Sequence, residues 1–259
     1  MVVERTGTRI PFSRDKPILG MLHLGGSDRE ERLAIAQQDV AALAEGGVDA
    51  VVVENYFGDV ADVVAALEWL QATKPPLLVG LNVLHDYREA FALAARFAVK
   101  FIQIDSVAGH LPPSEDAVFA SDLARLRREN PVYLLGGVRF KYQPVRSGRS
   151  LEDDLRLAME RCDAVVVTGE ATGQETDLDK VRRFREIVGQ EFPLLIGAGL
   201  TAANCREQLA LADGAIVGSY FKNTHRDDGV VELAHVAEIM ALVGDLRRQR
   251  AAVGDAGET

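Results

Sequence analysis

The sequence predicts a single-domain (β/α)8 barrel, and three observations lead to this fold class. Eight short apolar runs alternate with longer segments of helical period, and they begin about 28 residues apart, the length of a strand with its return helix. The runs are nearly continuous in Val, Leu and Ile, which is typical of parallel strands buried on both faces. No Pro-, Gly- or Ser-rich linker divides the 259 residues, a length that α/β barrels reach as one domain.

The expected elements follow in chain order. The strands are the apolar runs at residues 18–22, 50–53, 77–81, 101–104, 132–135, 164–167, 194–196 and 215–217. Segments rich in the helix formers Ala, Leu, Glu and Arg lie between them, among them 29–46, 60–72, 87–99, 151–161, 178–188 and 202–211, with a last helix over about 231–249. We expect residues 1–16 to cover the bottom of the barrel, 17–247 to form it and 248–259 to be a flexible tail.

An internal repeat supports the count of units. Asp49-Ala-Val-Val-Val recurs at Asp163-Ala-Val-Val-Val and, more loosely, at Asp213-Gly-Ala-Ile-Val. A doubly wound sheet is the alternative architecture, which a dinucleotide fingerprint in the first βα turn would support. The only similar sequence, Gly197-Ala-Gly199-Leu-Thr-Ala202, follows the seventh run instead. We therefore favour the barrel.

Composition and charge indicate which kinds of molecule the protein is unsuited to bind. The net charge of −10, from 29 basic and 39 acidic side chains, works against non-specific binding to nucleic acid or anionic lipid. No apolar run approaches the roughly 20 residues that span a bilayer, and the N-terminus lacks a signal-peptide pattern, so a cytoplasmic protein is expected. Cys162 and Cys205 form no metal-binding spacing and no disulfide framework. The sequence does not determine the oligomeric state, and a homo-oligomer is possible.

Polar side chains follow the apolar runs, where the loops at the carboxyl ends of barrel strands build an active site. The opposite strand ends carry little beyond turn residues. We therefore expect one functional mouth, and its expected substrate-binding residues are Asn55, Asn82, Arg139, Thr168, Gly169 and Glu170. A structural role is the alternative for several of these side chains, because Asn55 and Asn82 could cap helices.

Four ionisable side chains are the candidate catalytic residues. Glu54 and Asp105 follow the second and fourth runs and are the acid/base candidates. Lys141, after the fifth run, could pair with a ligand anion, act as a Schiff-base nucleophile if burial lowers its pKa, or be a surface charge. His23 follows the first run. His23, Glu54 and Asp105 could together bind a divalent metal ion, although they show no metal-ligand spacing. The sequence requires no cofactor.

The loops after the seventh and eighth runs predict a phosphate site. Barrels often hold phosphate between these two loops, where glycines let the backbone approach the anion and helix N-termini add favourable partial charge. The expected phosphate-binding residues are Gly197, Gly199, Thr201, Gly218, Ser219 and Lys222. The alternative is that the glycines only make tight turns and Thr201 caps the next helix. If the first interpretation holds, Gly199→Val should weaken phosphate binding and leave the fold intact.

Over residues 17–240 the chain resembles the BtpA/SgcQ family. The matching stretches are Gly20-Met21-Leu22-His23-Leu24-Gly25, Gly46–Asn55 with its Val51-Val52-Val53-Glu54-Asn55, Val79-Gly80-Leu81-Asn82-Val83-Leu84, Val166-Val167-Thr168-Gly169-Glu170-Ala171-Thr172-Gly173, Gly197-Ala198-Gly199-Leu200-Thr201 and Ala212–Lys222. The resemblance implies a barrel grouped with phosphate-binding barrels, in a family named for a factor that supports photosystem I. The first loop, Gly25-Gly26-Ser27-Asp28, is shorter than the family loop, which bears on substrate identity.

The sequence therefore supports two alternative hypotheses of function. The first is an enzyme, a lyase, isomerase or hydrolase, that acts on a small phosphorylated metabolite such as a sugar phosphate or a nucleotide-like compound. The second is a non-catalytic assembly or stabilising factor that keeps the barrel. The polar mouth favours the enzyme, because a scaffold has no need for several convergent carboxylates and amides.

Overall fold

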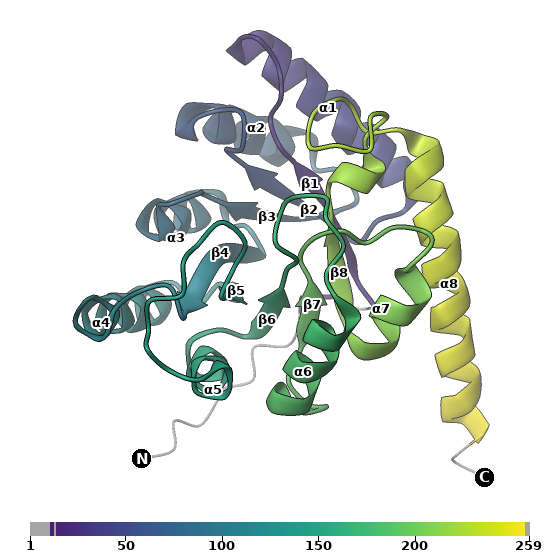
Figure 1. Cartoon of the computed structure of the whole chain (residues 1–259). Coiled ribbons are helices and arrows are strands. Elements are labelled where there is room, and N and C mark those ends of the chain that lie inside the picture. Colours follow the sequence, from purple (N-terminus) through teal and green to yellow (C-terminus); the bar gives the residue numbers. More distant parts are fainter. Residues whose placement is uncertain (1–10, 13, 257–259) are drawn as a thin grey trace.

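A computed structural model describes residues 11, 12 and 14–256 as one closed barrel of eight parallel strands, each followed by a helix on the outside (Figure 1). Neighbouring strands pair in sequence order, and β1 closes on β8. The fold predicted from the eight apolar runs is therefore confirmed. The strands are β1 Ile18–Leu22, β2 Ala50–Glu54, β3 Leu78–Asn82, β4 Phe101–Ala108, β5 Tyr133–Val138, β6 Ala164–Val167, β7 Leu194–Ile196 and β8 Gly214–Val217.

Five of the helices begin where a side chain accepts one of the first free backbone N–H groups. Asp28, Asp59, Asp86, Ser150 and Asp177 cap α1, α2, α3, α5 and α6 in this way, each accepting from the amide three residues on. The helices are α1 Arg29–Gly46, α2 Val60–Thr73, α3 Tyr87–Phe97, α4 Pro113–Glu129, α5 Leu151–Arg161, α6 Leu178–Val188, α7 Cys205–Leu211 and α8 Leu233–Ala256, with a 3-10 turn η1 Ser219–Phe221 after β8.

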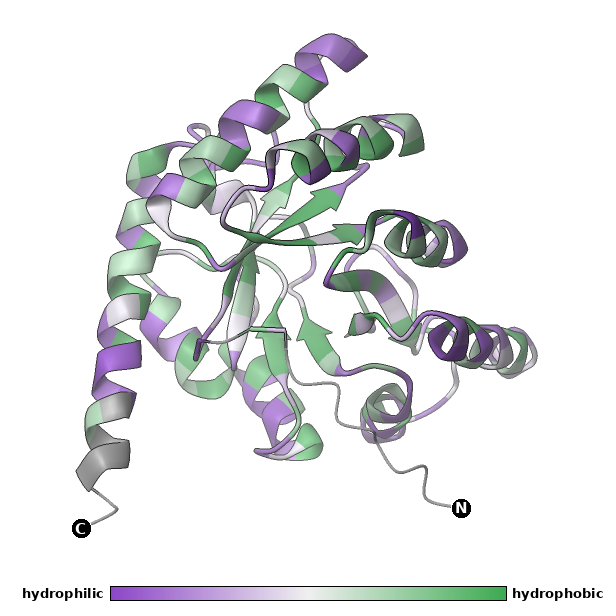
Figure 2. Ribbon diagram, turned by 180° about the vertical axis from the view of Figure 1, so that it is seen from behind, coloured by the Kyte–Doolittle hydropathy of each residue, from purple (hydrophilic) through white to green (hydrophobic). Residues whose placement is uncertain are grey.

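Alternation along the strands divides the buried residues into two cores. Side chains at every second position fill the inside of the barrel, and those between them pack against the helices. The strands are largely hydrophobic, whereas the helices carry both hydrophobic and hydrophilic faces (Figure 2). The inner core consists of Leu19, Met21, Ala50, Val52, Phe101, Tyr133, Leu135, Phe140, Ala164, Val166, Leu195 and Ile216.

The repeated aspartate at the start of three strands ties the bottom of the barrel together. One Asp163 oxygen accepts the Leu134 amide of the neighbouring strand at 2.8 Å, and the other pairs with Arg127 at 2.6 Å. Asp49 and Asp213 bind the same kinds of group, each through its Oδ2 atom: the backbone amides of Ile18 and Leu194 and the guanidinium groups of Arg247 and Arg185. The internal repeat therefore marks a structural device that joins adjacent strands at the end opposite the mouth.

Several boundaries differ from the expected ones. Strand β4 continues to Ala108, past residue 104, with an irregularity in its pairing to β5. Helix α7 begins at Cys205 and not at residue 202, because Thr201 and Asn204 bond to each other's amides and hold that stretch out of the helix. Helix α8 continues to Ala256, through most of the segment that we expected to be a flexible tail.

The described part of the N-terminal segment lies at the bottom of the barrel. The ring of Phe12 packs 5.5 Å from that of Phe101 at the start of β4, and Lys16 donates from Nζ to the carbonyl of Ala212 at 2.7 Å. The rest of the expected cover, residues 1–10 and 13, lies outside the described residues.

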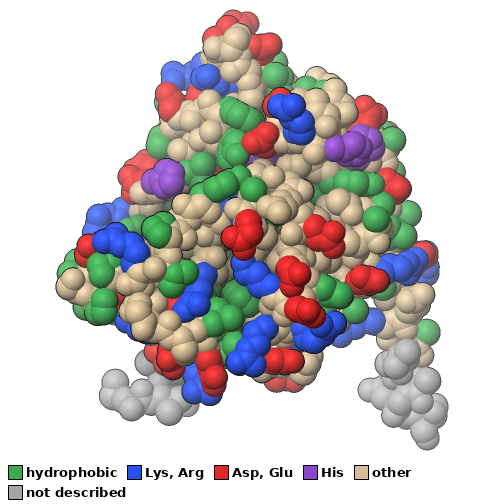
Figure 3. All heavy atoms as spheres, viewed as in Figure 1, with side chains coloured by type: hydrophobic (Ala, Val, Ile, Leu, Met, Phe, Trp, Pro, Cys, Tyr) green, Lys and Arg blue, Asp and Glu red, His purple; other side chains and the backbone are tan. Residues whose placement is uncertain are grey.

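The outer surface carries both signs of charge. Acidic and basic side chains are interspersed over the face in Figure 3, without one large patch of either sign. Within the described chain, every helix is too short or too polar to cross a lipid bilayer.

Candidate functional site

A cavity of about 440 Å³ opens among the loops at the carboxyl ends of the strands. It brings together the four candidate catalytic side chains and most of the expected phosphate-binding loop residues. The predicted residues on its wall are His23, Glu54, Asp105, Lys141, Gly197, Gly199, Thr201, Gly218 and Ser219. Its volume is typical of a small-molecule site.

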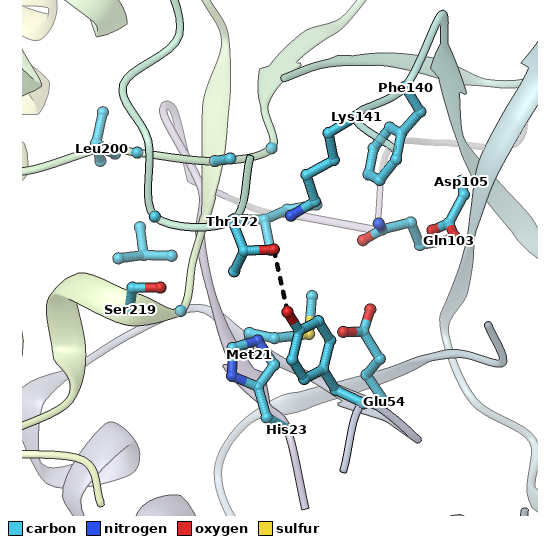
Figure 4. A pocket seen from close by; sticks show the side chains of 18 of the residues that line it. Met21, His23, Glu54, Gln103, Asp105, Phe140, Lys141, Thr172, Leu200 and Ser219 are labelled. Atoms are coloured by element: carbon cyan, nitrogen blue, oxygen red, sulfur yellow. Dashed lines mark hydrogen bonds between the residues drawn. The ribbon is translucent and has the colours of Figure 1, made fainter. Parts of the chain in front are cut away.

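Two carboxyl groups and one amide form the polar centre of the cavity. Asn82 Nδ2 donates to Glu54 Oε2 at 2.8 Å and to Asp105 Oδ1 at 3.0 Å, so one nitrogen joins both acids. Glu54 and Asn82 end adjacent strands, and they are only 6% and 1% exposed. In Figure 4, Glu54 and Lys141 enter the cavity from opposite sides and extend toward its centre. The site thus places two acids and an amine around one space.

Burial changes the pKa of all three groups in the direction that favours their neutral forms. Loss of water, reinforced by the nearby Asp105, raises the pKa of Glu54 to about 7, against the opposing effect of Lys141. Burial also raises the pKa of Asp105 and lowers that of Lys141. A carboxyl with a pKa near 7 can both give and accept a proton at neutral pH, which is what general acid/base chemistry requires.

Lys141 is positioned by strained backbone and an ion pair beside it. Its amide donates to Thr168 Oγ1 at 3.2 Å. Arg139, two positions before it, and Tyr142, directly after it, have positive φ angles of 48° and 63°. Non-glycine residues adopt such angles only where the surrounding structure imposes them. Arg139 bonds Asp154 at 2.9 Å and the carbonyl of Arg149 at 2.7 Å. We expected Arg139 to bind substrate, but its guanidinium group holds this loop instead.

His23 lies at the rim as a neutral imidazole. Its Nδ1 is 2.9 Å from the carbonyl of Asp227, which can only accept, so Nδ1 carries the proton and Nε2 is left as an acceptor. Burial and the positive charge of Lys222 lower the pKa of His23 to about 4. The ring of Tyr56 packs 4.8 Å away, and its hydroxyl donates to Asp227 Oδ2 at 2.8 Å.

We predict that His23 of the folded protein titrates with a midpoint near pH 4, well below the ordinary value of 6.5. The folded state then binds fewer protons than the unfolded state between these values, so its stability falls as the pH drops through that window. Proton NMR of the imidazole, assigned with His23→Gln, measures the midpoint, and the same titration in concentrated urea is the control. A midpoint near 6.5 in the folded protein would contradict the burial argument.

The loops after β7 and β8 form the other end of the cavity. Ser219 is 6% exposed, and its Oγ has no hydrogen-bond partner among the described residues although it lies on the cavity wall. Gly199 has a φ of 73°, and a Cβ there would lie 2.1 Å from the carbonyl oxygen of Gln174. The expectation that Gly199→Val leaves the fold intact is therefore wrong, and Ser219 is the residue with which to test this end of the site.

Several expected ligand residues have structural partners instead. Lys222 is 2% exposed and forms a buried ion pair with Asp39, whose other oxygen accepts the amide of Val231. Asn55 Oδ1 accepts the amide of Leu84 at 2.7 Å, so this side chain fixes the loop after β3. The residues that lie off the cavity wall are Asn55, Arg139, Thr168, Gly169, Glu170 and Lys222, with Asn82 reaching the site through its bonds to the two acids.

Glu170 and its neighbours follow β6 but stay out of the cavity. The Glu170 side chain is 84% exposed and lies 3.4 Å from Lys180. Thr168 accepts the amide of Lys141, and a Cβ at Gly169 would lie 2.7 Å from the Glu175 carbonyl. These residues shape the loops around the mouth.

Several polar residues of the wall were not among the predicted site residues, including Tyr56, Gln103, Tyr142, Gln143 and Thr172. Gln103 stands two positions before Asp105 on β4, so the alternation of a strand could have placed it on the same inner face. Its Oε1 is buried without a hydrogen-bond partner among the described residues. Thr172 comes from the long loop after β6, whose course no local pattern reveals.

The site has few groups for a metal ion. In the part of the chain that the structure describes, no three His, Cys, Asp or Glu side chains gather closely enough to hold one.

Comparison with known proteins identifies the family. A model of the BtpA family matches residues 14–245. The chain belongs to the BtpA family. An uncharacterized protein of Thermococcus kodakarensis is 32% identical over 90% of this chain and 97% of its own length. The photosystem I biogenesis protein BtpA of Synechocystis is 29% identical over 82% of each chain.

Solved structures agree on the barrel. The thiamine phosphate pyrophosphorylase of Pyrococcus furiosus superposes with a TM-score of 0.59 over 89% of this chain and 96% of that one, at 15% identity. At this identity the likeness concerns the fold, so the activity of the BtpA-family barrel has to be argued from its own residues.

Proposed function

We propose that this BtpA-family barrel is an enzyme, a lyase, isomerase or hydrolase, that acts on a small phosphorylated metabolite such as a sugar phosphate or a nucleotide-like compound. One observation carries the proposal: a buried carboxyl group, Glu54, and a partly buried one, Asp105, share the Asn82 amide and line one cavity with Lys141. Removing ionisable groups from water is costly for folding. Clusters whose pKa values are perturbed in this way, in a cleft, are typical of catalytic sites.

The loops after β7 and β8 would hold the phosphate. Ser219 supplies a buried hydroxyl without a partner among the described residues, and it stands at the start of η1, where backbone N–H groups are not used by the turn itself. The glycine loop after β7 lies on the same wall. The solved barrel of similar fold is named for a phosphate compound, which favours the same ligand class here.

Glu54 and Asp105 would move protons at the other end of the ligand. With a pKa near 7, Glu54 is protonated in about half of the molecules at neutral pH, so it can act first as an acid and then as a base. Asn82 holds both carboxyl groups in place through its two hydrogen bonds. Such positioning on strand ends is more rigid than positioning on loops.

An assembly or stabilising function is the second candidate. It is favoured by the printed name of the Synechocystis relative, a photosystem I biogenesis protein. A ligand-free scaffold would have little use for the acids that the cavity buries, so the binding experiment below separates the two.

The test is a thermal-shift screen of phosphorylated sugars and nucleotides, each beside its dephosphorylated counterpart. A true ligand raises the midpoint with concentration, as mass action requires. We expect phosphorylated compounds to stabilise the protein and their counterparts to do so much less. Ser219→Ala should weaken binding about tenfold or more, because a hydrogen bond to a charged group contributes about 1.5–3 kcal/mol.

Ser106→Ala is the matched control. The Ser106 hydroxyl is also buried without a partner among the described residues, but it does not lie on the cavity wall. Its removal should leave the affinity unchanged. If no phosphorylated compound in the screen stabilises the wild-type protein, the enzyme proposal fails and the assembly function gains support.

A further inference from the structure

Lys141 differs from the other lysines of the described chain in its surroundings. Lys16, Lys180 and Lys222 each give Nζ to a carbonyl or carboxylate oxygen, and Lys74 and Lys100 lie exposed on the surface. Lys141 Nζ forms no hydrogen bond or ion pair with any described residue, although it extends into a cavity that contains two acids (Figure 4). Its lone pair, once the amine is neutral, is therefore free to react.

Apolar side chains line part of the cavity around this amine. Nζ lies 5.6 Å from the centre of the Phe140 ring, and Met21 and Leu200 are among the apolar residues of the same wall. The oxygens of Glu54 and Asp105 closest to Asn82 are already occupied by its amide. The strained backbone at Arg139 and Tyr142 holds Lys141 from both sides. The Lys141 backbone is also held by its hydrogen bond to Thr168 Oγ1, while Nζ keeps no hydrogen-bond partner among the described residues.

We propose that Lys141 forms a covalent imine with the carbonyl carbon of an aldehyde or ketone substrate. This inference rests on the proposed function, because the carbonyl compound is taken to be the phosphorylated substrate. A phosphate held near Ser219 would leave the rest of a small sugar phosphate facing the part of the cavity that Lys141, Glu54 and Asp105 line. An imine withdraws electrons from the neighbouring carbon, which is the activation that lyase and isomerase reactions at that carbon require.

The step balances with the residues of the cavity. The neutral amine adds to the carbonyl carbon, a C–N bond forms, and the C–O π electrons move to oxygen, which takes a proton from Glu54 or Asp105. The nitrogen then gives one proton to the carboxylate so produced. A second proton from a carboxyl group lets the hydroxyl leave as water while the nitrogen lone pair forms C=N. Burial, which lowers the pKa of Lys141, increases the neutral fraction of the amine that starts the sequence.

Reductive trapping tests the proposal directly. The protein is incubated with dihydroxyacetone phosphate or, separately, with dihydroxyacetone, and sodium borohydride then reduces any imine to a stable secondary amine. Trypsin does not cleave after the modified lysine, so mass spectrometry should find the adduct in the peptide of residues 140–146. We expect adduct on Lys141 at least tenfold above that on any other lysine, at lower concentrations of the phosphorylated ketone.

The variants separate imine formation from binding. Lys141→Arg keeps the positive charge but cannot form an imine, so the adduct should disappear, whereas Lys100→Arg on the surface should leave it unchanged. No adduct on Lys141 in wild-type protein, or equal labelling of all lysines, would overturn the imine. If Lys141 formed no adduct but phosphorylated compounds still bound, and bound more weakly to Ser219→Ala, the proposed function would hold without the imine. Equal labelling of Lys141 by both ketones would support the imine and contradict the phosphate site.

Discussion

Replacing Glu54 with Gln is expected to stabilise the protein by about 2–3 kcal/mol at pH 8 and to change its stability little at pH 4. The pKa of Glu54 is raised from 4.5 to about 7, so the folded protein retains a proton between these values that the unfolded protein releases. The stability contributed by this group is therefore lost as the pH rises through that window, by about 1.4 kcal/mol for each pH unit. Glutamine is neutral at every pH and still accepts the Asn82 hydrogen bond.

Urea unfolding at pH 4, 6 and 8 measures the effect. Glu68→Gln is the control, because Glu68 forms only an exposed ion pair with Arg96, and its change should be small at every pH. We expect the Glu54→Gln protein to be more stable than the wild type. Once a substrate is known, its turnover should be slower by about a hundredfold or more. Destabilisation at pH 8 would mean that Glu54 is an ionised structural acceptor and not a strained acid.

Lys222→Met is expected to destabilise the protein by about 3–5 kcal/mol, as does the loss of one partner from a buried ion pair. Asp39 and Lys222 are each about 3% exposed at the side chain, and the pair joins α1 to the segment after η1. Without Lys222, the Asp39 carboxylate would stay buried with only the Val231 amide as a partner. Thermal and urea unfolding check the loss.

The double variant Asp39→Leu/Lys222→Met is the matched control. An apolar pair of similar volume removes both charges, so most of the stability should return. A Lys222→Met protein of wild-type stability that no longer bound phosphate compounds would instead restore the ligand role that the sequence suggested for Lys222.

The fold could be predicted because it depends on local patterns that repeat. Runs such as Val51–Val53 must be buried on both faces, and eight of them in sequence have one simple arrangement. The start of α7 was predicted wrongly because the side chains of Thr201 and Asn204 accept hydrogen bonds from each other's backbone amides. These bonds compete with the helical ones. Capping residues predict where a helix can begin, but not which of two competing hydrogen-bond patterns is formed.

The location of the site could be predicted better than the function of its members. Glu54 ends β2 and Asp105 lies in the second half of β4, so their convergence on the inner face follows from barrel geometry. Arg139 and Lys222 carry charges of the right sign at the right end, yet each is paired with an aspartate 15 or 183 positions away. Only the tertiary structure reveals these partners. A charge in a mouth loop therefore predicts a ligand contact only when no buried opposite charge lies within reach.

Crystals of the protein soaked in inorganic phosphate would show whether the cavity holds a phosphoryl group between the loops after β7 and β8. We expect a tetrahedral anion within hydrogen-bond distance of Ser219 Oγ, on the wall that carries Gly199 and across the cavity from Glu54. The same soak of Ser219→Ala should show weaker density at that position. An anion bound elsewhere in the barrel, or a mouth that stays empty at phosphate concentrations that saturate such sites, would contradict this expectation.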